Sequence, residues 1–150
     1  MRALHVLGRA IFGGFFVYNG INHLRNAKAM EPYAASKGVP AAEQAVLATG
    51  LIMFVGGLSI IAGLKPKRGL AAIVGFLLAA SVQMHRFWEQ QGQQRQMEEI
   101  QFMKNMALLG AALALMHLDE PWPASVDAAR ARDEEMFVRL GGRDLRALPA

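Results

Sequence analysis

The sequence predicts an all-α membrane protein: a four-transmembrane-helix bundle with both termini on the cytoplasmic side, followed by a short C-terminal amphipathic helix. Hydrophobic residues make up 53% of the 150 positions and charged residues 19%, and the charges are almost absent from four separated apolar runs. Each run approaches the ~20 residues that a helix needs to cross a hydrocarbon core. Lys and Arg flank these runs, as they do at membrane surfaces.

The predicted spans are residues 3–24, 45–64, 69–85 and 102–118, which together make a membrane domain over residues 1–118. A cleaved signal peptide is the alternative for the first span, because Ala27-Lys28-Ala29 imitates a cleavage site. The apolar stretch is, however, longer than the ~7 to 15 residues of a signal core. A soluble four-helix bundle would need a polar stripe on every helix, and GFLLAASVQM and ALLGAALALM have too few polar residues to supply one.

The turn Lys65-Pro66-Lys67-Arg68 sets the predicted orientation, because positive charge in short loops favours the cytoplasmic side. An even number of crossings then places both termini in the cytoplasm. Residues 25–44, with Pro32, Gly38 and Pro40, are expected to form an outer loop. So is the polar segment 86–101, whose glutamates, including Glu98, are interpreted as a solvated face.

Small residues recur at helical spacing in the last three spans and predict close helix packing in lipid. The positions are Gly50 and Gly57, Gly56 and Gly63, Ala71, Gly75 and Ala79, Ala107 and Ala111, and Gly110 and Ala114.

Residues 119–150 form a polar cytoplasmic tail. Pro121 and Pro123 break the chain around Trp122, and Ser125 is the predicted N-cap of a helix that ends at Gly141-Gly142. The apolar side of this helix either lies on lipid, docks on a partner or stays loosely solvated; its residues are Val126, Ala129, Phe137 and Leu140.

Ionisable residues inside a span invite a functional hypothesis, and Arg9 is the clearest case. It either snorkels to the cytoplasmic surface or forms a buried ion pair, a structural ion site. Phe16, Gly20 and His23 share its helix face, which is expected to look into the bundle.

Polar residues of three spans should meet at the outer end and form one mouth above an apolar interior. Such a mouth either binds a quinone or lipid, or serves as a hydrogen-bonded cap that holds the helix ends together. The candidate residues are Tyr18, Asn19, His23, His85, Trp88, Lys104 and Asn105.

Several classes of chemistry are disfavoured. The chain has no cysteine, so thiol chemistry and Cys-ligated metals are excluded. No metal site is predicted, since at most two of the four histidines share a surface. The net charge of +4 forms no basic stripe with interleaved aromatics, which argues against nucleic acid. We expect no catalytic centre and no intrinsic cofactor.

A series of segments along the chain resembles the DoxX family of small four-helix membrane proteins. In sequence order they are Gly8-Arg9, FGGFFVYNGINHL, KGVP, LIMFVGGLSIIAGLKPKRG, the pair His85 and Trp88, and FMKNMALLGAAL. The resemblance spans residues 4–117 and implies a multi-pass protein of the bacterial cytoplasmic membrane, linked to quinone-coupled oxidation and membrane oxidoreductase assemblies. Many relatives carry a glutamate where this chain has Met53, which counts against autonomous proton-coupled catalysis. The matching positions are Arg9, His23, His85, Lys104 and Asn105.

The resulting prediction is an accessory subunit that packs, among membrane lipids, against other subunits of a larger redox complex. The alternatives are a quinone-reactive subunit, in which His23 or His85 handles the proton and Lys104 steadies the reduced ring, and a membrane assembly factor or transporter.

Overall fold

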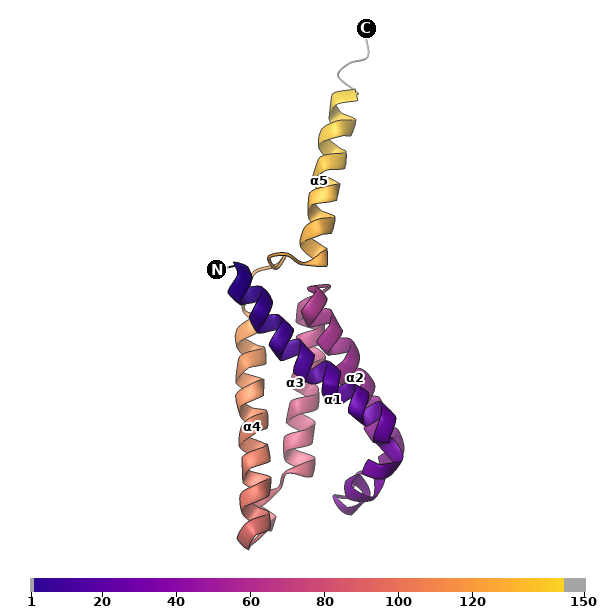
Figure 1. The fold of residues 1–150 in the computed structure, drawn as a ribbon, viewed down its shortest axis with the longest axis vertical. Helices are drawn as coiled ribbons and strands as arrows, with labels where there is room; N and C mark the ends of the chain where they lie inside the picture. Colours follow the sequence, from indigo (N-terminus) through magenta and orange to yellow (C-terminus); the bar gives the residue numbers. More distant parts are fainter. Residues whose placement is uncertain (1, 145–150) are drawn as a thin grey trace.

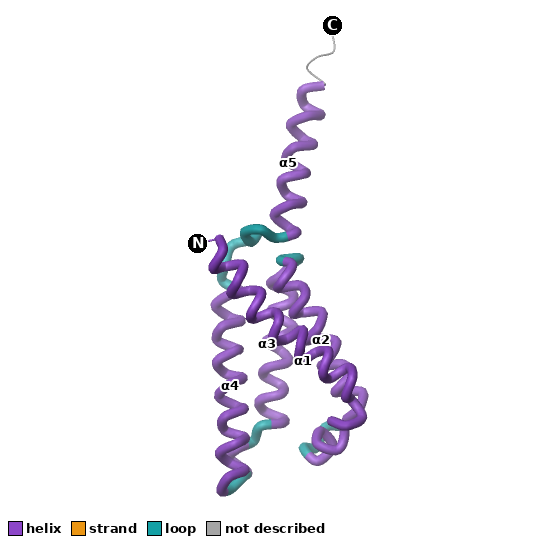
Figure 2. Tube along the Cα trace, viewed as in Figure 1, coloured by secondary structure: helices purple, strands orange, loops and turns teal. Residues whose placement is uncertain are grey.

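A computed structural model describes residues 2–144, and within that range the chain is helical and contains no strand. Helices α1 to α4 lie in a bundle, and α5 extends beyond one end of it (Figure 1). Short connections join most of them (Figure 2). The elements are α1 (Arg2–Ser36), α2 (Ala42–Ala62), α3 (Pro66–Met84), the short 3-10 helix η1 (Phe87–Glu89), α4 (Gly92–Met116) and α5 (Val126–Asp144).

Two stretches are long and apolar enough to cross a membrane by length and composition, Ala42–Ala62 and Pro66–Glu89. They correspond to the second and third predicted spans. Among the described residues α1 and α4 do not meet the same criterion. Polar side chains such as Arg9, Asn19 and Asn22 interrupt the apolar run of α1 and lower its hydropathy.

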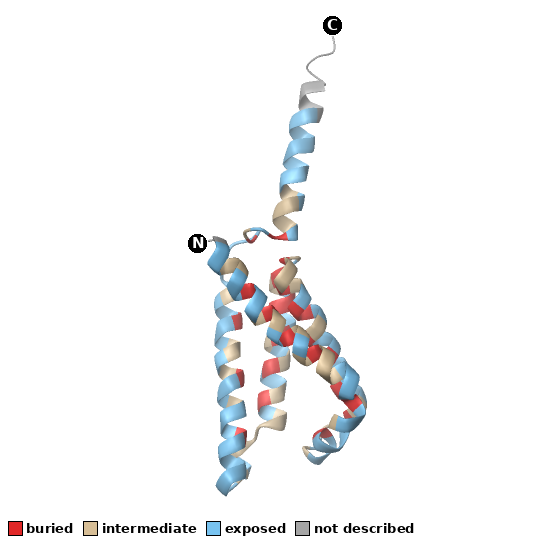
Figure 3. Cartoon of the chain, viewed as in Figure 1, coloured by how far each residue is buried: buried red, intermediate tan, exposed pale blue. Residues whose placement is uncertain are grey.

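Helix pairs pack in the order of the chain: α1 against α2, α2 against α3, and α3 against α4. The crossing of α1 and α2 is especially close. A Cβ added to Gly20 would lie 2.6 Å from the backbone nitrogen of Phe54, and one added to Gly57 would lie 2.6 Å from the carbonyl oxygen of Gly13. Figure 3 shows buried residues gathered at this crossing. Small residues are therefore required here by backbone contact between the helices.

The small residues on α3 and α4, which were expected to pack closely against other helices, are exposed instead. Ala71, Gly75 and Ala79 are exposed, and a Cβ on Gly75 would meet no other packed atom within 4 Å among the described residues. Gly110 is equally open. The prediction that these residues mediate close helix packing is therefore wrong within this chain, because no neighbouring helix lies against them.

The expected outer loop over residues 25–44 is mostly helix, which corrects the prediction. α1 is kinked at Asn26, whose φ and ψ are −118° and 21°, and then continues to Ser36 with Pro32 inside it. Alanine is the strongest helix former, and this segment is rich in it. Ala27 and Ala34 are buried in a cluster with Ala42 and Val46 of α2. Packing and propensity together outweigh the proline.

The polar segment 86–101 is also largely ordered. Its last part belongs to α4, which begins at Gly92, so the expected loop is wrong for those residues. Gln, Arg, Met and Glu all have high helix propensity, and this explains how a strongly polar stretch continues directly into an apolar helix.

The start of α1, the α2–α3 turn and the linker before α5 meet at one end of the bundle. Trp122 is buried there and lies edge-on to His5, with ring centroids 5.2 Å apart. The backbone N–H of Lys65 donates to the Asp127 carboxylate over 2.7 Å. The Ala128 N–H donates to the Ser125 hydroxyl over 3.0 Å, which is an N-cap. α5 thus begins where the sequence predicts, and it continues past Gly141.

Candidate functional site: a groove between the helices

A cavity of about 1140 Å³ lies between the helices of the bundle, and α1, α2, α3 and α4 all line it. We call it the groove. Its floor includes the small residues Ala71, Gly75 and Ala79 of α3, while Phe15 and Phe16 of α1 line one wall. The α3 residues on this side are small, and they leave the space between the helices open. Volume and lining are typical of a site for a small apolar molecule.

Polar side chains interrupt this apolar lining at intermediate depth. His23 Nδ1 lies 3.1 Å from the Thr49 hydroxyl oxygen, and that hydroxyl donates to the Val46 carbonyl over 3.0 Å. Since a hydroxyl has a single proton to donate, Thr49 accepts from His23, and Nδ1 carries a hydrogen. Asn105 on α4 is buried and also lines the groove.

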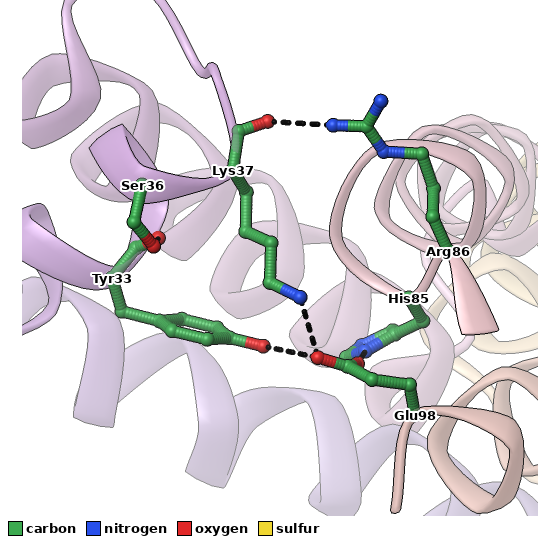
Figure 4. A network of polar contacts seen from close by, with 6 residues as sticks. All are labelled: Tyr33, Ser36, Lys37, His85, Arg86 and Glu98. Atoms are coloured by element: carbon green, nitrogen blue, oxygen red, sulfur yellow. Dashed lines mark hydrogen bonds and ion pairs between the residues drawn. The ribbon is translucent and has the colours of Figure 1, made fainter. Parts of the chain in front are cut away.

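A network of four side chains closes one end of the groove, and Glu98 of α4 is at its centre (Figure 4). Lys37 Nζ lies 2.5 Å from Glu98 Oε1, and the Tyr33 hydroxyl donates to the same oxygen over 3.3 Å. His85 Nδ1 lies 2.8 Å from Oε2. Glu98 is only 7% exposed. Its interpretation as part of a solvated face is therefore wrong.

The backbone carbonyl of Lys37 also holds this end of the groove together. The carbonyl of Lys37 accepts a hydrogen bond from Gln83 Nε2 over 2.8 Å and another from Arg86 Nη2 over 3.1 Å. Lys37 follows α1, whereas Gln83 belongs to α3 and Arg86 follows it. The end of α1 is thereby held to α3 by its backbone and to α4 by its side chain. We call Tyr33, Lys37, His85 and Glu98 the closing network.

Electrostatics within the closing network favour an ionised Glu98. Burial raises the pKa of this carboxyl, but the hydrogen bonds from Lys37 and His85, together with the positive charge of Lys37, outweigh burial and leave the pKa below its usual range. Burial, followed by the charge of Glu98, raises the pKa of the Tyr33 phenol. Tyr33 therefore stays protonated near neutral pH and donates, while Glu98 accepts.

The structure brings part of the predicted mouth together. Tyr18 lies outside the groove lining and is 73% exposed. Trp88 also lies outside it, edge-on to the ring of Phe87. The other residues of the predicted mouth line the groove: Asn19, His23, His85, Lys104 and Asn105. That they bind a ligand stays a prediction.

Sequence reasoning missed Tyr33, Lys37 and Glu98. Tyr33 and Lys37 fall in the region interpreted as a loop, and Glu98 lies among glutamines that indicate solvent. A buried partner 61 residues away, as Lys37 is from Glu98, leaves no local pattern in the sequence. Between residues 2 and 144 no three His, Asp or Glu side chains gather as a metal site would require, and the prediction about metals stays a prediction.

Arg9 neither reaches the surface nor forms an ion pair with any carboxylate among the described residues. It is 4% exposed, and its guanidinium donates to the carbonyl of Ala124. The linker before α5 folds over the start of α1 and covers the side chain. Phe16 and Gly20, on the same helix face, are buried as expected, and His23 is half-buried.

Comparison with known proteins identifies a family. The DoxX family model matches residues 4–86. No curated protein and no solved structure matches the chain. The matched region includes His23 and His85 but ends before α4. It therefore does not include the segment KNMALLGAAL, which contains Lys104 and Asn105, and it does not include Glu98. Because residues 4–86 are more than half of the 150, the chain belongs to the DoxX family, a family of small membrane proteins.

Proposed function

We propose that this DoxX protein crosses the cytoplasmic membrane four times, with both termini in the cytoplasm, and binds a quinone or lipid in its groove. The observation that carries the proposal is the groove itself, with its apolar floor and walls and a polar network at one end. A lipophilic molecule with a polar head has the same distribution of polarity. The apolar walls would hold its chain, and His85 and Glu98 would lie near its head.

Burial of the polar residues of α1 supports its placement in the membrane. Arg9 is buried under the linker, and Asn19 and His23 line the groove. These side chains therefore face protein, as polar residues in spans usually do. The start of α1 and the linker after α4 also meet at one end of the bundle, which agrees with an even number of crossings.

The experiment fills the groove without disturbing the fold. Gly75→Leu adds a side chain above the groove floor, where no packed atom opposes it, and Gly110→Leu is the matched control because it lies outside the groove and is equally open. Each purified protein is extracted with organic solvent, and bound quinone and lipid are quantified by mass spectrometry. We expect a ligand at about one per chain in the wild type and Gly110→Leu, and its loss in Gly75→Leu. Equal ligand content in all three proteins contradicts the proposal.

A second proposal, an accessory role in a larger membrane redox complex, is favoured by α5. This helix extends away from the bundle (Figure 1), and Phe137 and Val138 are 78% and 71% exposed. Apolar side chains this exposed on a helix outside the bundle are typical of docking surfaces. Co-purification of haem or flavin proteins with the wild type, and its loss on Phe137→Ser, is the expected result. A wild-type protein that purifies alone with its quinone contradicts the accessory role.

A further inference from the structure

The closing network determines which nitrogen of His85 carries a proton. His85 Nδ1 lies 2.8 Å from Glu98 Oε2. The other carboxylate oxygen, Oε1, accepts from Lys37 and Tyr33. An ionised carboxylate can only accept hydrogen bonds, so the hydrogen between the two groups belongs to Nδ1. In a neutral imidazole the second nitrogen is then an acceptor.

This second nitrogen, Nε2, is available to a ligand. His85 lines the groove, and its Nε2 has no hydrogen-bond partner among the described residues yet is not enclosed by protein. His23 also lines the groove, and its Nδ1 donates to Thr49. The acceptor that the inference uses is Nε2 of His85.

We propose that the groove prefers a head that carries a hydroxyl group, of the phenol or hydroquinone class, over one that has only carbonyl or ether oxygens. His85 Nε2 accepts the hydroxyl hydrogen, and Glu98 is the positioning residue that holds the single hydrogen of the neutral imidazole on Nδ1. This inference rests on the proposed binding of a lipophilic molecule in the groove. A head without a donor displaces water from this acceptor and leaves it without a hydrogen bond, which lowers the affinity of that head.

The test compares two probes that differ in one hydrogen-bond donor, para-decylphenol and its methyl ether. Their dissociation constants are measured by calorimetry on the full chain in detergent at mildly alkaline pH. The two probes partition differently into micelles. For each protein variant we therefore take the ratio of the two dissociation constants, and we compare this ratio between variants. One net hydrogen bond corresponds to a preference of about fivefold for the phenol.

Glu98→Gln is the decisive variant. Its amide can donate to Nδ1, which allows Nε2 to carry the hydrogen instead, so the preference for the phenol should fall about fivefold. Glu99→Gln is the matched control, because it makes the same change from carboxylate to amide at the exposed neighbour of Glu98, which does not line the groove. We expect it to keep the wild-type ratio. His85→Leu should lose the preference through direct removal of the acceptor.

The outcomes separate the two proposals. If both probes bind and the ratio is unchanged in Glu98→Gln and His85→Leu, the hydroxyl preference is wrong while binding in the groove stands. If neither probe binds to the folded wild type, both proposals are overturned. Circular dichroism establishes that each variant is folded. If Glu98→Gln does not fold, His85→Leu alone decides, since an unchanged ratio in that variant contradicts the role of Nε2.

Discussion

Arg9 near the start of α1 donates a hydrogen bond to the backbone carbonyl of Ala124, which lies 115 positions later in the chain. The contact covers a buried guanidinium and ties the linker before α5 to the first helix. Trp122 in the same linker is 1% exposed and packs against His5. The start of α1 and the linker before α5 are therefore held together at one end of the bundle.

Arg9→Met should release this linker while the bundle stays folded. A hydrogen bond from a charged group contributes about 1.5 to 3 kcal/mol, and its loss should expose Trp122. Acrylamide quenching of tryptophan fluorescence, in a Trp88→Phe background, measures that exposure. Arg25→Met is the control, because Arg25 is exposed and should leave quenching unchanged. Unchanged quenching in Arg9→Met would show that the linker is held by other contacts.

The ionised state of Glu98 predicts a stability that depends on pH. The folded protein holds the pKa of Glu98 below its ordinary value of 4.5. A carboxyl with a lowered pKa stabilises the fold fully above its unfolded value, and this stabilisation disappears as the pH falls through the lowered pKa. The free energy of unfolding of the wild type should therefore exceed that of Glu98→Gln at neutral pH, and the difference should shrink in acid.

Denaturant titrations in detergent from about pH 6 to about pH 3 measure this difference. Glu99→Gln is the matched control, because Glu99 is the exposed neighbour of Glu98 on the same helix, and its curve should parallel the wild type. A difference between wild type and Glu98→Gln that is constant over the whole range contradicts the assignment of an ionised, paired carboxylate.

The close crossing of α1 and α2 makes Gly20 intolerant of any side chain. A Cβ at this position would lie 2.6 Å from one backbone atom of α2 and 2.7 Å from another. Gly20→Ala should therefore force the helices apart and destabilise the protein by about 1 to 3 kcal/mol. Gly14→Ala, where nothing lies within 4 Å, should be neutral or stabilising by up to about 1 kcal/mol. Thermal unfolding in detergent distinguishes the two, and equal effects would argue against the close crossing.

The N-cap at Ser125 predicts a local effect on α5. Ser125→Ala removes the acceptor of the Ala128 N–H bond and should destabilise the first turn of α5 by about 1 kcal/mol. Hydrogen exchange of the amides in residues 126–130 should accelerate accordingly. Ser36→Ala, which removes a hydroxyl bonded to the Tyr33 carbonyl, is the control and should leave α5 exchange unchanged.

Local patterns in the sequence were sufficient for the parts of the fold that depend on them. The second and third predicted spans, on either side of the turn at Pro66, correspond to α2 and α3, and Ser125 predicts the start of α5. His23 and His85 stand at the ends of apolar runs, and both line the groove. All these inferences use residues that are neighbours in the chain or on one helix face.

What the sequence did not predict depends on contacts between distant segments. Pro32 indicates a loop locally, but burial of Ala27 and Ala34 against α2 holds the segment in a helix. Glu98 resembles its solvated neighbours and differs from them only because Lys37 and His85 surround it. Gly75 has the spacing of a helix contact but lines the groove instead, with no packed atom near the position of a Cβ.

The contact between the linker and α1 gives the protein a mechanical connection across its length. α5 projects from the bundle (Figure 1), and its base is attached to Arg9 and to the α2–α3 turn. Arg9 belongs to the same helix as Asn19 and His23, which line the groove. The helix that forms a wall of the groove is therefore also the helix to which the base of α5 is attached.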